Sequence, residues 1–283
     1  MLRIALQAKG RLNEDCLELI AEAGISIQTS KRQLLSKSAN FPIEVLYLRD
    51  DDIPQAVANG IADVGIVGLN EVKEKNFNVD IAHNLGFGAC RLSLAIPKHV
   101  DYPGVQWFNG KRVATSYPVI LKRFFDEQGI SANIEVIAGS VEVAPAVDMA
   151  DAIFDIVSSG GTLVSNGLVE VEKVLFSEAV LVATPNLPAE KKEVLDKLIF
   201  RFESVERSRG KKYLLLNVRN ESIDDVLALL PGMKSPTLLP LAQKGWSSIH
   251  TVVSEEELWD KIERLKAIGA EDILVLSLEK MIY

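Results

Sequence analysis

Strand-like and helix-like stretches alternate along the first two-thirds of the chain, and this alternation limits the fold more than any other feature of the sequence. Short apolar runs over 2–6, 43–48 and 64–67 predict buried strands. Apolar residues with helical spacing over 13–23, with Asn13 as the N-cap, predict the first helix. This order is typical of a mostly parallel sheet covered by helices, so the sequence predicts an α/β fold.

A second block of the same kind begins near residue 90. Its predicted elements are a strand over 90–96, a strand over 112–114, a helix over 118–128, strands over 134–137 and 152–157, strand character over 174–183 and a helix over 189–207. The phrase at 62–67 is echoed weakly at 150–156, each time before a turn that contains glycine. The echo suits two similar lobes that face each other across a cleft.

After residue 210 the pattern changes to strand, helix, strand, strand, helix, strand. The predicted elements cover 211–217, 223–230, 237–241, 248–253, 255–268 and 272–276. This β-α-β-β-α-β order is typical of a ferredoxin-like domain, and a module of about seventy residues can fold independently. The basic stretch at 207–212 is the predicted hinge.

Composition excludes several classes of function. The net charge is −8, from 31 basic and 39 acidic residues, and no run of Lys and Arg alternates with aromatic residues, so we expect no nucleic-acid partner. We expect no membrane association and a cytoplasmic location, because no apolar run is long enough to span a bilayer and residues 1–6 enter a strand pattern without a secretory signal.

Metal-ligand and nucleophile patterns are equally sparse. Cys16 and Cys90 are the only cysteines, which is too few for a disulfide framework, and both are interpreted as core or pocket-wall residues. The three histidines show no metal-ligand spacing, so the sequence predicts neither a zinc site nor a histidine-dependent triad.

The strongest local signal for chemistry is the segment 155–163, directly after a predicted strand. Ligands of open α/β sheets bind beyond the carboxyl ends of strands. The segment offers hydroxyl donors and glycines that suit a monophosphate, namely Ser158, Ser159, Gly160, Gly161 and Thr162. Asp155 could accept hydrogen bonds from ribose hydroxyls. The alternative is a plain Ser/Gly turn with a capping Asp.

Other candidates lie at predicted helix starts or stand as isolated arginines. Lys9, Gly10 and Arg11 place two cations at a helix N-terminus, where an anion is favoured, although solvated surface charge explains them too. The remaining candidates are Ser116, Tyr117, Glu142, Arg32 and Arg49. Tyr117 could stack on a base or simply pack beside a helix cap. A surface ion pair is the default for each arginine, and a helix N-terminal carboxylate is the default for Glu142.

Several of these segments together carry a family resemblance. The segments are 9–12, 62–68, 112–118, 139–142, 158–163 and the tail 267–275. The chain resembles the ATP phosphoribosyltransferase family along essentially its whole length, in the long form with a regulatory domain. The resemblance implies transfer of the phosphoribosyl group of phosphoribosyl pyrophosphate to N1 of ATP, with release of pyrophosphate, as the first step of histidine biosynthesis. It also implies Mg²⁺ as cofactor, dimers and hexamers, and histidine as an allosteric inhibitor.

The resemblance further implies a domain plan. A region with two lobes, like a periplasmic binding protein, would precede the ferredoxin-like domain. Residues 1–87 with 175–208 would form the first catalytic lobe, 88–174 the second lobe with the phosphate loop, and 211–283 the regulatory domain.

Residue roles also follow from the resemblance. Asp155, Glu142 and Arg11 are the expected catalytic residues. The expected substrate-binding residues are Lys9, Gly10, Arg32, Arg49, Ser116, Tyr117, Asp151 and the loop Ser158, Ser159, Gly160, Gly161 and Thr162. The expected allosteric residues are Ser235, Thr237, Ala270 and Ser277, and no protein ligand of the metal is assigned.

Two other readings use the same residues. A non-catalytic solute-binding or effector-sensing protein could have the same two lobes. Residues 211–283 could also serve only for oligomerisation, without a ligand. Adenine N1 is a neutral nucleophile, so a transferase of this kind needs no activated Ser or Cys, and catalysis should come from alignment and charge placement.

Overall fold

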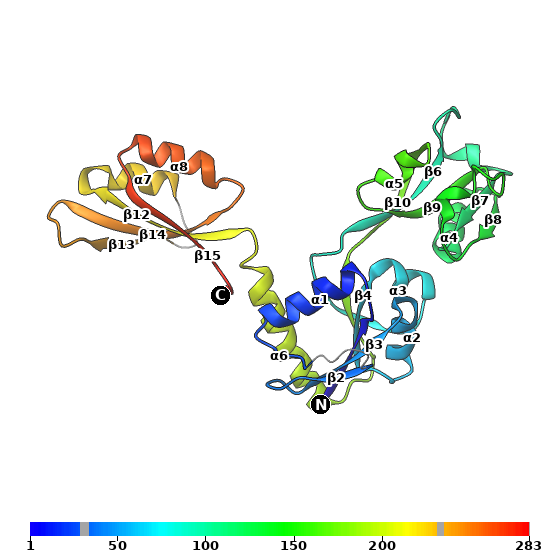
Figure 1. Cartoon of the computed structure of the whole chain (residues 1–283), viewed down its shortest axis with the longest axis horizontal. Coiled ribbons are helices and arrows are strands. Elements are labelled where there is room, and N and C mark those ends of the chain that lie inside the picture. The colour runs from blue at the N-terminus through cyan, green and yellow to red at the C-terminus, as the bar shows by residue number, and fades with distance from the viewer. Residues whose placement is uncertain (29–33, 231–234, 283) are drawn as a thin grey trace. The chain divides into compact units, whose positions relative to one another are not determined.

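The computed structural model describes residues 1–28, 34–230 and 235–282. The chain divides into two compact units, Met1–Ile199 and Phe200–Tyr283 (Figure 1). The predicted Arg32 lies outside the described residues. Each unit is built around its own sheets and is described separately below.

The first sheet of unit Met1–Ile199 is parallel at its centre, where β1 pairs with β3 and β4. Its strands, in spatial order, are β2 (Leu35–Lys37), β3 (Ile43–Leu48), β1 (Leu2–Gln7), β4 (Val64–Gly68), β11 (Ala179–Ala183) and β5 (Asp80–Asn84). Its helices are α1 (Arg11–Glu22), α2 (Ile53–Ala58) and α3 (Leu69–Lys75). Leu2, Ile4 and Leu6 are fully buried, as expected for a strand covered on both faces.

The second sheet of this unit mixes parallel and antiparallel pairs. Its strands, in spatial order, are β10 (Leu168–Ser177), β6 (Cys90–Pro97), β9 (Ala152–Val157), β7 (Arg112–Thr115) and β8 (Asn133–Val136). The helices α4 (Pro118–Gln128) and α5 (Gly161–Ser165) follow β7 and β9 in the chain. Phe108, Phe125 and Phe154 lie in its core. Short 3-10 helices occur at η1 (Asp50–Asp52), η2 (Val105–Phe108) and η3 (Val141–Val143).

Two chain crossings connect the sheets and are hydrogen-bonded to each other. Leu85 N donates to Ala179 O at 3.0 Å, and Ala179 N donates to Phe87 O at 2.9 Å. Crossings paired in this way are a natural hinge between the two lobes.

The sequence echo at 62–67 and 150–156 corresponds to a structural repeat. Asp63 precedes β4 and accepts a hydrogen bond from the Arg3 backbone N–H at 2.8 Å. Asp151 precedes β9 and accepts one from the Arg112 backbone N–H, also at 2.8 Å. In each lobe one aspartate therefore fixes the start of its own strand against that of the neighbouring strand.

Unit Phe200–Tyr283 has the strand order that defines a ferredoxin-like domain. Its strands, in spatial order, are β13 (Thr237–Pro240), β14 (Trp246–Ser254), β12 (Lys211–Arg219) and β15 (Glu271–Ser277). Its helices are α7 (Ile223–Leu229), which follows η4 (Asn220–Ser222), and α8 (Leu258–Ala267). The pairs of β12 with β14, β12 with β15 and β13 with β14 are antiparallel, and Leu214, Leu216, Ile249 and Leu265 are fully buried. The predicted fold of this domain is confirmed.

The division between the units falls inside α6 (Ala189–Glu206), earlier in the chain than the predicted end of the first lobe at 208. The C-terminal tail explains the difference. Met281 N donates to Ser204 O at 2.7 Å, and Ser208 Oγ donates to Glu279 O at 3.0 Å. These bonds tie the end of α6 and the turn after it to the C-terminal unit.

Some predictions of local structure need correction. The first helix begins at Arg11, with Gly10 rather than Asn13 at its cap, and Asn13 Nδ2 instead donates to Gln7 O. The strand character predicted over 174–183 is divided between β10 and β11. In the described part of the chain, no helix has both the length and the apolar character needed to cross a membrane.

Candidate active site

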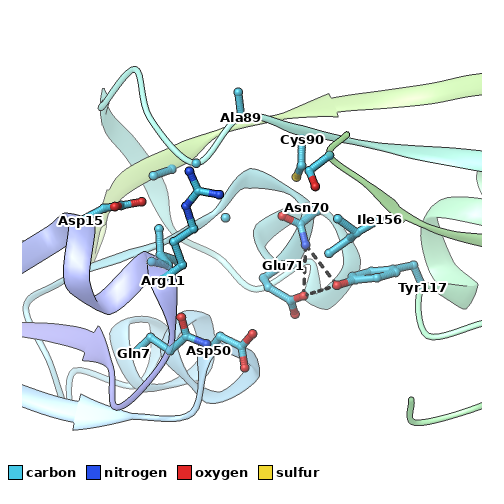
Figure 2. Close-up of a pocket in the computed structure, with 15 residues that line it drawn as sticks. Gln7, Arg11, Asp15, Asp50, Asn70, Glu71, Ala89, Cys90, Tyr117 and Ile156 are labelled. Carbon is cyan, nitrogen blue, oxygen red and sulfur yellow. Dashed lines mark hydrogen bonds between the residues drawn. The ribbon is translucent and has the colours of Figure 1, made fainter. Parts of the chain in front are cut away.

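Two adjoining hollows lie in unit Met1–Ile199. The larger has a volume of about 450 Å³ and receives residues from both lobes, among them Arg11, Glu71 and Tyr117 (Figure 2). The smaller, of about 60 Å³, is formed by residues around the segment Ser158–Thr162. Ile156 and Ser158 line both hollows, so the two spaces adjoin at the end of β9.

The smaller hollow brings together the residues of the predicted phosphate loop. Its wall contains Glu142, Asp155 and the loop Ser158, Ser159, Gly160, Gly161 and Thr162. Gly160 has a φ of +82°, a conformation that a residue with a side chain would adopt only under strain. The loop therefore needs glycine at this turn, where its backbone borders the hollow.

Asp155 stands near the end of β9, beside the loop. Its Oδ1 accepts a hydrogen bond from the Ile156 backbone N–H at 2.7 Å. Burial raises the pKa of Asp155 above its ordinary value, the bond from Ile156 lowers it, and the nearby charge of Glu142 raises it further. The two acids thus face the same hollow and repel each other.

The start of α1 contributes to the larger hollow. Arg11 is the first residue of this helix and lines the hollow together with Gln7 and Asp15. Gly10 has a φ of +102°, which lets the chain turn from β1 into the helix. Lys9 is exposed and precedes this turn without appearing among the residues that line the described hollows.

Tyr117 is held in a buried hydrogen-bond network that connects the two lobes. Its hydroxyl donates to Glu71 Oε1 at 2.9 Å, and Asn70 Nδ2 donates to the same oxygen at 3.1 Å (Figure 2). Ser177 Oγ donates in turn to Asn70 Oδ1 at 2.9 Å. Burial, more than the neighbouring Glu71, raises the pKa of the Tyr117 hydroxyl. Tyr117 is therefore a neutral donor at the wall of the larger hollow.

Sequence reasoning missed Asn70 and Glu71. Burial raises the pKa of Glu71 in the first place, and the bond from Tyr117 lowers it. A Cβ atom on Gly68 would lie 2.3 Å from Asn70 Oδ1, so this turn also needs glycine. The available signal was the weak echo between 62–67 and 150–156, because it makes the turn after β4 equivalent to the loop after β9.

The α3 helix also fixes the start of α4. Glu74 accepts hydrogen bonds from Val119 N at 2.9 Å and from Ile120 N at 3.0 Å, and a carboxylate in this position satisfies free N–H groups of the first turn. Ser116, a predicted substrate-binding residue, donates its hydroxyl to Ile137 O at 2.7 Å. In the described structure Ser116 thus supports the turn before α4.

Two predicted substrate-binding residues are engaged elsewhere. Asp151 lies at the start of β9, at the other end of the strand from the phosphate loop, and forms an ion pair with Arg112 at 3.0 Å. Asp151 thus supports the pairing of β9 with β7, away from the loop Ser158–Thr162. Arg49 is strongly exposed and lies 3.3 Å from Asp51, next to Asp50 in the wall of the larger hollow.

The cysteines have structural positions. Cys16 is buried in α1, and burial raises the pKa of its thiol to about 12. Cys90 lies in the wall of the larger hollow, and burial raises the pKa of its thiol as well. Neither group is a thiolate at neutral pH, so neither is placed to act as a nucleophile.

The predicted allosteric residues are spread over the C-terminal unit. Thr237 lies on the edge strand β13, while Ser277 lies on β15 at the opposite edge and accepts a hydrogen bond from Lys212 Nζ at 3.2 Å. Ala270 lines a hollow of about 630 Å³ beside α8, together with Trp259 and Asp272. Ser235 precedes β13. One chain alone does not bring these residues together.

Fold and site define a class before any relative is considered. Two α/β lobes share a cleft in which acids, an arginine and a glycine-containing hydroxyl loop converge, and a ferredoxin-like domain follows. Such an arrangement is that of an enzyme or receptor for an anionic small molecule.

Comparison with known proteins identifies the family. Residues 49–204 match ATP phosphoribosyltransferase, and residues 208–280 match the family described as HisG, C-terminal domain. The ATP phosphoribosyltransferase of Phocaeicola vulgatus is 60% identical over 282 residues, and the match covers 100% of both chains. That of Cytophaga hutchinsonii is 52% identical over 282 residues, covering 100% of this chain and 99% of its own. The chain belongs to the ATP phosphoribosyltransferase family.

Solved structures support the same fold. The ATP phosphoribosyl transferase (HisG:HisZ) complex from Thermotoga maritima aligns with a TM-score of 0.62 at 28% identity, covering 72% of this chain and 99% of that chain. The substrate binding protein of an amino acid ABC transporter aligns with a TM-score of 0.50 at 10% identity, covering 73% of this chain and 93% of that chain, which shows likeness of fold alone. The prediction of lobes like those of a periplasmic binding protein is confirmed.

Proposed function

We propose that this chain transfers the phosphoribosyl group of phosphoribosyl pyrophosphate to N1 of ATP and releases pyrophosphate, as the first step of histidine biosynthesis. Full-length identity of up to 60% to ATP phosphoribosyltransferases supports this function. The observation that carries it is that two hollows adjoin at the end of β9. The smaller one suits a monophosphate, and it shares Ile156 and Ser158 with a larger one that can hold the second substrate.

The smaller hollow is the proposed site of the sugar phosphate. The loop Ser158–Thr162 would bind the 5′-phosphate through its hydroxyls and backbone N–H groups. Asp155 would accept hydrogen bonds from the ribose hydroxyls, which is how a carboxylate at a strand end can orient a sugar. Glu142 lies in the same wall and would face the positive charge that builds on the ribose as its C1–O bond breaks.

The larger hollow is the proposed site of the purine and the polyphosphates. Arg11, in the wall of this hollow, would contact the departing pyrophosphate. For Lys9, Arg32 and Arg49, a role toward the polyphosphates follows from the family resemblance alone. Tyr117 would lie against the adenine, since its ring is fixed by Glu71 and Asn70 in the wall of this hollow. Alignment of two bound substrates supplies most of the rate in such a reaction.

Mg²⁺ is the proposed cofactor and would enter with the substrates' phosphates. In residues 1–28, 34–230 and 235–282, no cluster of three or more His, Cys, Asp and Glu side chains is arranged to hold a metal ion. We therefore propose that the substrates' phosphates, more than side chains of the described residues, hold the ion, and no step of the reaction is assigned to it.

The C-terminal unit is the proposed site of feedback inhibition by histidine. Thr237 and Ser277 lie at opposite edges of one sheet, so a site containing both would need a second copy of the chain. This supports the proposal that the chain assembles with further copies of itself; dimers and hexamers are the proposed forms. Substitution of Thr237 by Ala should change the inhibition constant of histidine more than the basal rate. We also propose a cytoplasmic location.

Pyrophosphate release in the presence of ATP and phosphoribosyl pyrophosphate tests the function. A coupled pyrophosphate assay should show turnover that requires both substrates and Mg²⁺. Saturable binding of both without turnover would instead identify a two-lobed sensor, which is the alternative that the identity to known transferases does not favour.

A further inference from the structure

Arg91 occupies a position that the proposed site residues do not explain. It lies on β6, opposite Val157 of β9, and its side chain is 23% exposed. Its Nε and Nη2 atoms donate to the two carboxylate oxygens of Glu170 on β10 at 2.5 and 2.6 Å. Ser93 Oγ also donates to Glu170, at 2.6 Å. The Glu170 carboxylate therefore fixes the orientation of the Arg91 guanidinium plane.

The remaining edge of this guanidinium reaches the phosphate loop. Arg91 Nη1 donates to the carbonyl oxygen of Ser158 at 3.0 Å. A trans peptide is planar, and its carbonyl and the next N–H point in opposite directions. Because Arg91 holds the Ser158 carbonyl on its own side, the Ser159 N–H is directed away from Arg91. An amide fixed in this way needs no reorganisation when an anion binds.

We propose that Arg91, held by Glu170, is a positioning residue that sets the Ser158–Ser159 peptide for the phosphate of the sugar substrate. The proposal rests on the assignment of loop Ser158–Thr162 as the phosphate site. Arg91 acts through the backbone of the loop and does not contact the substrate. Its contribution belongs to the binding of the phosphate end and not to the purine.

The first sheet contains a matched control. Arg3 on β1 donates through Nε to Glu44 Oε1 at 2.8 Å and through Nη1 to the carbonyl oxygen of Ile61 at 3.0 Å. It thus repeats the same arrangement of arginine, glutamate on a neighbouring strand and loop carbonyl. Neither Arg3 nor Ile61 lines the two hollows of the site. Loss of the Arg3 contacts should therefore disturb the first sheet in a comparable way and leave the loop Ser158–Thr162 unchanged.

The experiment compares Arg91→Lys with Arg3→Lys in the full chain. Lysine keeps the charge but loses the planar fork that holds both Glu170 and Ser158. Titration calorimetry with ribose 5-phosphate reports the sugar-phosphate part of the donor without pyrophosphate or ATP, and steady-state kinetics report both substrates. Arg91→Lys should weaken ribose 5-phosphate binding and raise the KM for phosphoribosyl pyrophosphate by the same factor of roughly ten, while the KM for ATP changes less than about twofold. Arg3→Lys should change none of these.

Glu170→Gln provides a second variant. It keeps the shape of the partner but removes its charge, so the same selective change should appear with smaller size. If Arg91→Lys does not fold, as judged by thermal unfolding, this variant decides the question in its place.

Several results would overturn the proposal. One is unchanged affinity for ribose 5-phosphate in both variants of the Arg91–Glu170 pair. Another is an equal rise in the KM values of both substrates, which would indicate a general structural defect, and a third is the same effect from Arg3→Lys. A wild-type chain that binds ribose 5-phosphate but releases no pyrophosphate would refute the proposed reaction only, because the ribose 5-phosphate titration still tests Arg91. Absence of any binding by the wild type would refute both.

Discussion

The two lobes of unit Met1–Ile199 begin their central strands alike and end them differently. Asp63 and Asp151 each accept the backbone N–H of a neighbouring strand at 2.8 Å. At the other end, β4 leads into Asn70 and Glu71, which bond to Tyr117, while β9 leads into a loop of exposed hydroxyls and glycines.

This difference separates support from binding. At the end of β4 the polar groups satisfy one another across the lobes, so they fix the geometry of the cleft wall. At the end of β9 the loop Ser158–Thr162 borders a hollow, and its donors are available for an anion. One scaffold, used twice, thus supplies one rigid wall and one open loop, which is the proposed binding loop.

The largest expected effect comes from Asp155, the acid at the open end of β9. Asp155→Asn should reduce kcat/KM for phosphoribosyl pyrophosphate by on the order of 100-fold, because the amide cannot accept from both ribose hydroxyls and the sugar loses its alignment. Steady-state pyrophosphate release measures the loss. Asp151→Asn changes an acid at the other end of β9 and should leave this kcat/KM almost unchanged. Similar losses in both variants would contradict the proposal that the sugar binds at the Asp155 end of the strand.

The shared start of the strands predicts a loss of stability without loss of chemistry. Asp63 has a side chain that is only 11% exposed, and it also pairs with Lys191. Asp63→Ala should lower the free energy of unfolding by about 2–3 kcal/mol, because it leaves a buried N–H and a cation without their partner. Asp151 is more exposed, so Asp151→Ala should cost less.

Urea denaturation measures this pair of variants. A larger loss for Asp151→Ala than for Asp63→Ala would show that exposure does not decide the strength of the repeated contact. Both variants should keep their KM values at a temperature where they remain folded.

The closed end of β4 predicts a smaller effect. Tyr117→Phe removes one hydroxyl from a buried network and should lower the free energy of unfolding by about 1 kcal/mol. Ser159→Ala removes a hydroxyl from the open loop and should change it by less than about 0.5 kcal/mol. Thermal unfolding of the two variants compares the end of β4 with the end of β9. Equal losses of stability would mean that the polar groups after β4 do not support the fold more than those after β9.

Much of the scaffold was predictable from local patterns. The bounds predicted for 43–48, 118–128 and 152–157 agree with those observed, because apolar runs or Pro and Gly residues mark both ends. The strand β5 was missed because its residues are mostly exposed or half-buried and show no apolar pattern. The short α3 and α5 were missed because a helix of one or two turns carries little periodicity.

The site was predictable only where a single segment contains it. The loop Ser158–Thr162 is continuous in sequence, and its hydroxyls and glycines indicate an anion. By contrast, Glu71 meets Tyr117 and Arg91 meets Glu170 through contacts between residues far apart in the chain. The significance of such residues depends on tertiary neighbours, which a local pattern does not contain.

The smallest expected effect concerns Asp155 and Glu142, the two acids in the wall of the smaller hollow. The pKa of Asp155 is raised chiefly by burial and further by the charge of Glu142. In its proposed role Asp155 accepts from the ribose as a carboxylate, and with a raised pKa it becomes protonated sooner as the pH falls. An aspartate ordinarily has a pKa of about 3.9. The acid limb of kcat/KM for phosphoribosyl pyrophosphate should therefore lie at a higher pH than that value. Glu142→Gln removes a repelling charge, so the pKa of Asp155 should fall and the limb should move to lower pH by less than about one unit.

The position of the limb tests this coupling separately from the height of the profile, which will fall if Glu142 also acts in catalysis. Glu135→Gln is the matched control, because this exposed glutamate on β8 does not line the smaller hollow. Its acid limb should coincide with that of the wild type. A limb that stays in place or moves to higher pH in Glu142→Gln would mean that Asp155 does not titrate the reaction. The loop after β9 could then still bind phosphate, but the ionisation of Asp155 would not control the binding of the sugar.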